Sequence, residues 1–120
     1  GSWPALMAAA DGVVDAAAMA HPSHRKLCDN FHKEREVNAM FEASACPMLI
    51  MPCGNDDDRD KADGESEAAL KRSGQPYTIK EFGAMSHGFV LRGDVEDEAV
   101  ARGVAEAMNL MVAHFTEHLR

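Results

Sequence analysis

The chain has 120 residues and a formal net charge of −8, with 12 lysine and arginine residues against 20 aspartate and glutamate residues. Phosphate binding requires a basic surface, so this acidic balance argues against a nucleic-acid partner. Three cysteines without CxxC spacing argue against a disulfide framework and a zinc cluster, and they suit a reducing cytoplasm. No apolar run approaches the ~18 residues that a membrane span needs. The length fits one domain or part of one.

The first half of the chain predicts a helix, a short strand and a charged helical region. Pro4 to Ala10 has a proline suited to a first helical turn, followed by strong helix formers. Val13 to Ala20 is almost entirely apolar, which predicts a short strand covered on both sides, although its alanine content leaves a helix open. Arg25 to Phe41 has apolar residues at roughly helical spacing, which predicts one or two irregular helices.

The second half predicts two strands and two helices in alternation. Cys46 to Gly54 is a compact apolar run of the kind found in a buried parallel sheet. Lys61 to Ser73 has helical composition, and Tyr77 to Phe82 alternates like a partly exposed strand. Asp94 is a suitable N-cap for a long final helix. The apolar face of that helix is predicted from the spacing of Val100, Val104, Met108, Met111, Phe115 and Leu119.

This order predicts an α/β fold, a parallel sheet with flanking helices that contains about three strands and three to four helices. A sheet of three strands would leave the edge beside Val13 to Ala20 open. We therefore expect a partner on that edge, either an N-terminal half of the same domain or a second copy of the chain.

The best candidates for chemistry are Asp57 and His87. Asp57 follows the predicted strand at Cys46 to Gly54, and His87 follows the strand at Tyr77 to Phe82. Sites in open parallel sheets form outside the carboxyl ends of the strands, where a carboxylate can orient an imidazole. Two alternatives stay open: Asp56 or Asp58 could replace Asp57, and His87 could be a structural loop histidine.

These segments resemble the dienelactone hydrolase family of α/β-hydrolases. The run Leu49 to Asp57 resembles the acid segment of that family, and His87-Gly88-Phe89 with Arg92-Gly93 resembles its catalytic-histidine loop. Ala18 to Ser23 is similar to the strand after the nucleophile helix. The resemblance covers residues 1–120 as a partial domain, the C-terminal half of a family member without the N-terminal strands and the nucleophile elbow.

The resemblance implies a hydrolase of small-molecule esters or lactones, with a Cys or Ser nucleophile upstream of this chain. His87 would be the base, Asp57 its acid partner, and Arg92 a substrate-binding residue for a carboxylate. No cofactor or metal is implied, and the chain alone is expected to be inactive. The alternative is a truncated or degenerate hydrolase-fold module that serves in dimerisation or binding.

The other histidines and the cysteines favour structural roles. Cys46 and Cys53 flank a predicted buried strand, and Cys28 has no elbow motif around it, so none of them is expected to be the nucleophile. His114 and His118 are four residues apart, but no third ligand is placed near them, which favours a role at the helix C-terminus over a metal site.

Overall fold

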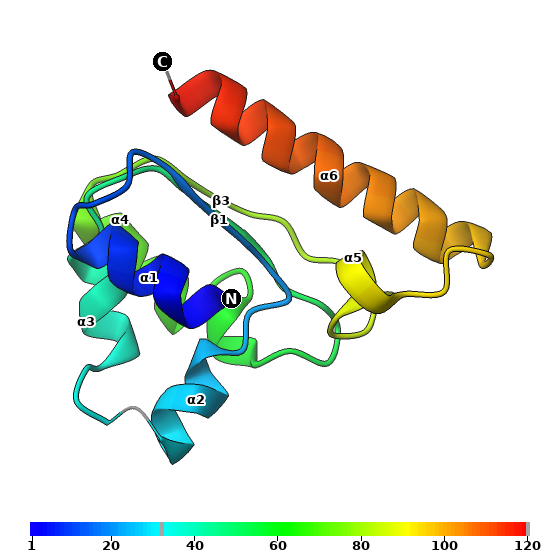
Figure 1. The fold of residues 1–120 in the computed structure, drawn as a ribbon. Coiled ribbons are helices and arrows are strands. Elements are labelled where there is room, and N and C mark those ends of the chain that lie inside the picture. Colours follow the sequence, from blue (N-terminus) through cyan, green and yellow to red (C-terminus); the bar gives the residue numbers. More distant parts are fainter. Residues whose placement is uncertain (32, 120) are drawn as a thin grey trace.

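The computed structural model describes residues 1–31 and 33–119, and its three strands are β1 (Ala17–Ala20), β2 (Met48–Met51) and β3 (Tyr77–Ile79). The α-helices are α1 (Ser2–Ala10), α2 (His24–Asn30), α3 (Val37–Glu42), α4 (Glu65–Ser73), α5 (Phe89–Arg92) and α6 (Glu98–His118). A 3-10 helix, η1 (Asp58–Asp60), precedes α4 (Figure 1).

All three strands are parallel, in the order β1-β2-β3. Met19 on β1 lies opposite Ile50 on β2, which in turn lies opposite Ile79 on β3. The α/β class and the three predicted strands are therefore confirmed, and β1 forms one edge of the sheet. The helices exceed the three or four expected, because the region from Arg25 to Phe41 contains both α2 and α3 and the histidine loop contains α5. His32, within that predicted helical region, lies outside the described residues.

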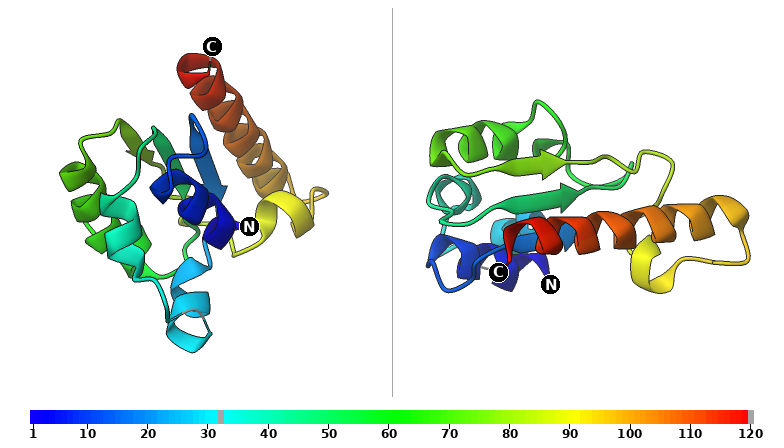
Figure 2. Two further views of the ribbon diagram at one scale, coloured as in Figure 1. Left: turned by 60° about the vertical axis from the view of Figure 1, so that its left-hand side comes forward. Right: turned by 90° about the horizontal axis from the view of Figure 1, so that it is seen from above.

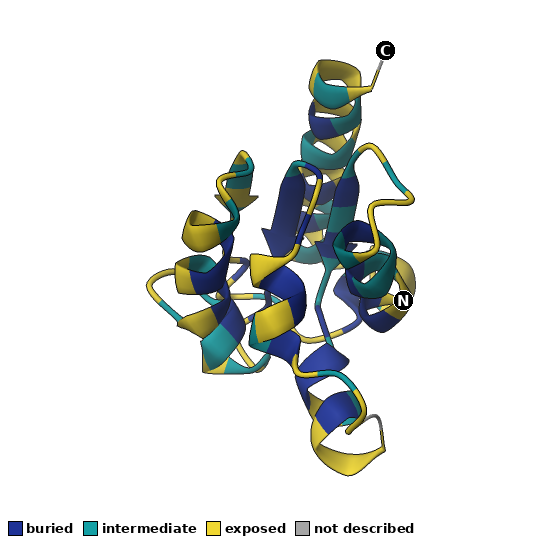
Figure 3. Ribbon diagram, turned by 90° about the vertical axis from the view of Figure 1, so that its left-hand side faces the viewer, coloured by how far each residue is buried: buried dark blue, intermediate teal, exposed yellow. Residues whose placement is uncertain are grey.

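The central strand β2 divides the core into two clusters. Met48 and Ile50 point into the cluster with α1, α3 and α4, and Leu49 and Met51 point into the cluster with α5 and α6. Successive side chains of a strand point to opposite faces, so four consecutive apolar residues fit a strand that is covered on both sides. Figure 3 shows the buried centre and the exposed outer surfaces of the helices.

The helices form one layer on each face of the sheet. Figure 2 shows α1, α3 and α4 on one side and α6 on the other. Gly103 and Ala107 are the buried residues that bring α6 close to the other elements, and a Cβ at Gly103 would lie 3.1 Å from Sδ of Met85. The small side chains therefore set the depth at which α6 packs.

The packing of α6 corrects two expectations. Its buried residues are Gly103, Ala107 and His114, whereas Met108 and Leu119 of the predicted apolar face are exposed. Val104 and Met111 of the predicted face do pack against the core, but the closest approach is made by the small residues, so the contact face is only partly the predicted one. The N-cap is Asp97, whose side chain accepts hydrogen bonds from the Ala99 and Val100 amides, and not Asp94.

Other predicted elements begin or end at different residues. The strand expected from Val13 starts only at Ala17, and Val13 is exposed. The strands expected to reach Gly54 and Phe82 end at Met51 and Ile79, although Cys53 and Phe82 still pair in an isolated parallel bridge. Among the helices in the described ranges, none combines the length and apolar character required to cross a membrane.

Candidate active site

The loops that follow β2 and β3 meet at the carboxyl edge of the sheet. The Gly54 amide donates a hydrogen bond to the Met85 carbonyl, with a distance of 3.1 Å between nitrogen and oxygen. A Cβ on Gly54 would lie only 2.2 Å from the carbonyl oxygen of Gly83, so this contact requires glycine. The first loop carries Asn55, Asp56 and Asp57, and the second carries His87.

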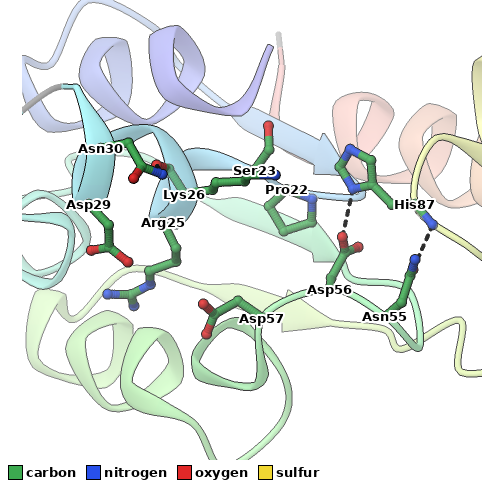
Figure 4. Close-up of a pocket in the computed structure, with 10 residues that line it drawn as sticks. All are labelled: Pro22, Ser23, Arg25, Lys26, Asp29, Asn30, Asn55, Asp56, Asp57 and His87. Atoms are coloured by element: carbon green, nitrogen blue, oxygen red, sulfur yellow. Dashed lines mark hydrogen bonds and ion pairs between the residues drawn. The ribbon is translucent and has the colours of Figure 1, made fainter.

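His87 is held at two points by the first loop (Figure 4). Its Nδ1 lies 2.6 Å from Oδ1 of Asp56, and its backbone amide donates to Oδ1 of Asn55 over 2.7 Å. A carboxylate on Nδ1 favours the tautomer that has its proton there and leaves Nε2 able to accept another proton. The side chain of His87 is 35% exposed.

The carboxylate of Asp56 is almost completely buried, with 4% of its side chain exposed. Its second oxygen, Oδ2, accepts a hydrogen bond of 2.7 Å from the Cys53 backbone amide. A carboxylate that accepts bonds on both oxygens has a fixed orientation, and its low exposure strengthens the attraction to a protonated imidazole. Asp56 therefore has the geometry of the acid partner of His87.

The expected contact between Asp57 and His87 is replaced by a contact between Asp57 and Arg59. Oδ1 and Oδ2 of Asp57 bind the Arg59 guanidinium over 2.9 and 2.7 Å, and Oδ1 also accepts a hydrogen bond from the Arg59 amide at the start of η1. The hydrogen bonds from Arg59 hold the pKa of Asp57 at about 2. Asp56 and Asp57 point in different directions because the chain turns between them into η1.

The spacing of the acid segment after Gly54 favoured Asp57, whereas the structure places Asp56 on His87. Asn55 was also missed, because an amide beside an acidic run has no motif of its own. Arg59, two residues after Asp57, is the local signal that could have separated the two carboxylates. Its guanidinium binds the carboxylate of Asp57, which is the N-cap of η1.

Arg92 lies close to the His87 loop, in α5. A Cβ on Gly88 would lie 2.8 Å from Nη2 of Arg92, so the guanidinium packs over the backbone of the residue after His87. Gly88 has a φ of 92°, which favours glycine. Arg92 and His87 together line two surface cavities, so Arg92 lies near the candidate site, as expected.

A cavity of about 670 Å³ lies between the acidic loop and α2, and its wall includes His87, Asp56, Asp57, Lys26 and Asn30 (Figure 4). A second cavity of about 420 Å³ lies beside β1, with His21, His87 and Arg92 in its wall. His87 is thus accessible from both the α2 side and the open edge of the sheet.

The three cysteines do not have the character of nucleophiles. All are buried, and burial raises the pKa of Cys28, Cys46 and Cys53, to about 12 for Cys53 beside Asp56. A reactive cysteine requires a lowered pKa and some exposure, so their position agrees with the expected structural role. Within residues 1–31 and 33–119, no group of three or more His, Cys, Asp or Glu residues is arranged to hold a metal ion.

A second His-Asp pair, also missed from the sequence, is fully buried behind the site. Oδ1 of Asp60 lies 2.9 Å from Nε2 of His24 and 3.2 Å from Nε of Arg25, and it accepts a hydrogen bond from Ser66. Burial alone would raise the pKa of Asp60, but His24, Ser66 and Arg25 outweigh it and lower the pKa. His24 and Asp60 are 0% exposed, so this group ties α2 to the loop after β2 and cannot meet a substrate.

The fold is therefore an open parallel α/β sheet, and its histidine-carboxylate pair lies at the carboxyl edge, where sites form in this class of protein. The family model described as the dienelactone hydrolase family matches residues 1–119, and the chain belongs to this family. Comparisons with curated proteins and with solved structures gave no match.

Proposed function

We propose that this chain supplies the base and the acid of a carboxylic ester or lactone hydrolase, with His87 as the base and Asp56 as its partner. The observation that supports this most directly is the 2.6 Å contact between Nδ1 of His87 and a carboxylate that is 4% exposed. Membership of the dienelactone hydrolase family gives the reaction class. We propose a small ester or lactone as the substrate and the cytoplasm as the setting.

The proposed reaction is acyl transfer in two steps. A Cys or Ser nucleophile gives its proton to Nε2 of His87 as it attacks the carbonyl carbon, and the imidazolium is stabilised by Asp56. His87 then protonates the leaving oxygen, and water releases the acyl group by the same route. Arg92 would hold a carboxylate of the substrate.

We propose that the nucleophile comes from an upstream segment that lies along the open edge of β1. This edge borders the 420 Å³ cavity that contains His87, so a residue placed there would reach the base. The N-terminal half of the same domain, or a second copy of the chain, would cover the edge.

The first test compares Asp56→Asn with Asp57→Asn as a matched pair in the natural polypeptide that contains this chain. Removing the charge that orients a catalytic histidine lowers kcat by about 10⁴-fold in a serine-protease triad, so Asp56→Asn is expected to lower kcat/KM by about 10³ to 10⁴-fold. Asp57→Asn is expected to change it less than about tenfold, since this carboxylate binds Arg59. The reverse ranking would refute the assignment of Asp56.

The second test measures hydrolysis of an activated aryl ester by the 120-residue chain alone. We expect the same rate as for His87→Ala, because the buried cysteines cannot form the acyl intermediate. Robust turnover that depends on His87 would place the nucleophile inside this chain and contradict the proposal of an upstream nucleophile.

A second candidate function is a non-catalytic module for dimerisation or binding. It is favoured by the outer face of α6, where Met108, Val112 and Leu119 are 47%, 62% and 46% exposed. Exposed apolar patches often mark interfaces. Hydrolysis of an activated aryl ester by the natural polypeptide separates the two: a tight dimer in sedimentation equilibrium whose hydrolysis is unchanged by His87→Ala would favour this candidate.

A further inference from the structure

His21 occupies a position beside His87 that the proposed mechanism does not use. It follows β1 directly, and its backbone amide donates a hydrogen bond of 2.8 Å to the Met51 carbonyl, which extends the pairing of β1 with β2. Its φ is 39°, in the left-handed region that few residues other than glycine adopt. The sheet and the buried Pro22 after it therefore fix where the His21 side chain leaves the backbone.

The His21 ring meets the His87 ring edge to face. The ring centroids are 5.0 Å apart, with an angle of 69° between the planes, and His21 is also edge-on to Phe89 at 6.2 Å. His87 is otherwise held by Asn55 at its backbone and by Asp56 at one ring nitrogen. The His87 ring turns about its Cβ–Cγ bond, and a neighbouring ring packed against it limits that rotation together with the hydrogen bond at Nδ1.

The surroundings of His21 favour the neutral form of its ring. Burial lowers the pKa of His21, and the charge of a protonated His87 lowers it further, against smaller opposing effects from its own backbone and from Asp56. The ring nitrogen Nε2 is buried and has no hydrogen-bond partner. A neutral ring can remain against His87 when the latter takes a proton, whereas a charged ring would repel it.

We propose that His21 is a positioning residue for His87: its ring packs against the His87 imidazole and keeps Nδ1 on Asp56 and Nε2 free for the reacting group. This inference rests on the proposed function, because it gives His21 a role in orienting the proposed base. It does not depend on the nucleophile, so it is testable in the 120-residue chain.

The test uses the ¹⁵N chemical shifts of His87, which report the tautomer of the ring, in wild type and two variants near pH 8. His21→Gly removes the ring and accommodates the positive φ, so the fold is expected to persist. His21→Phe keeps an aromatic ring and removes both nitrogens. We expect one Nδ1-protonated tautomer in wild type and in His21→Phe, and averaged Nδ1 and Nε2 shifts in His21→Gly.

The outcomes separate this inference from the proposed function. A wild-type tautomer in His21→Gly would overturn the positioning role, even where Asp56→Asn disturbs His87. Averaged shifts in His21→Phe, with a fold that amide spectra show to be intact, would overturn it as well, because a ring nitrogen and not the packing would then be required. A lack of hydrolysis in the natural polypeptide, with these shifts as expected, would refute the proposed function alone.

Discussion

Removal of the buried carboxylate of Asp60 is expected to destabilise the fold strongly. Its side chain is 0% exposed and faces the Arg25 guanidinium, which is 5% exposed, at 3.2 Å. Asp60→Asn keeps the shape of the residue and leaves Arg25 as a buried cation. Breaking a buried ion pair in this way costs about 3 to 5 kcal/mol. Glu65, 3.9 Å from the same guanidinium and largely exposed, offers some compensation, so we expect about 3 kcal/mol, the lower end.

The corresponding fall in melting temperature follows from the entropy of unfolding. At about 2.1 cal/mol/K per residue, the 120 residues give about 0.25 kcal/mol/K, so a loss of about 3 kcal/mol lowers Tm by about 12 °C. Urea denaturation followed by circular dichroism at pH 7 measures the free energy of unfolding. The matched control is Asp58→Asn, because Asp58 lies in the same loop and its side chain is 93% exposed, so we expect a change within about 0.5 kcal/mol. If both substitutions lowered the free energy of unfolding equally, the burial of Asp60 would not be the cause of its effect, and this reasoning would be refuted.

Two further predictions concern the loop contact and the pH dependence of stability. Gly54→Ala places a methyl group 2.2 Å from the Gly83 carbonyl oxygen and is expected to destabilise the fold by about 1 to 3 kcal/mol, measured by urea denaturation. Gly83→Ala, with open space around its Cβ, is the control, and equal losses would show that the close approach is not the cause. Burial lowers the pKa of His114 below its ordinary value of 6.5, so the unfolded chain binds a proton first and stability falls as the pH drops below 6.5. His114→Gln is expected to make the free energy of unfolding less dependent on pH in this range, and an unchanged slope in urea titrations between pH 5 and 8 would contradict this assignment.

The fold could be predicted from the sequence because its clearest apolar run forms β2, a strand in which all four residues are buried. Met48 to Met51 is an uninterrupted apolar run between two prolines, which is typical of a strand covered on both faces and so favours a parallel sheet with helices on each side. Element ends were less well predicted. Val13 has strand propensity but lies where no partner strand extends, so it is exposed.

The position of His87 was also accessible from the sequence, and the carboxylate that contacts it was not. His87 lies in a loop after a strand, and loops at the carboxyl ends of parallel strands meet at one edge whatever their detailed path. The choice between Asp56 and Asp57 depends on where the chain turns into η1 and on the Arg59 guanidinium that binds Asp57. Neighbouring carboxylates have the same chemistry in a sequence, and only their directions in space distinguish them.

The sequence by itself therefore determined the α/β class, the order of the elements and the loop that carries His87, since these depend on local patterns of apolar residues. The tertiary structure decided which carboxylate contacts His87, that Asn55 anchors its backbone, that His21 packs against its ring and that His24 and Asp60 are buried together. Each of these contacts joins residues distant in the chain or depends on the direction of a side chain, and local spacing contains no information about either.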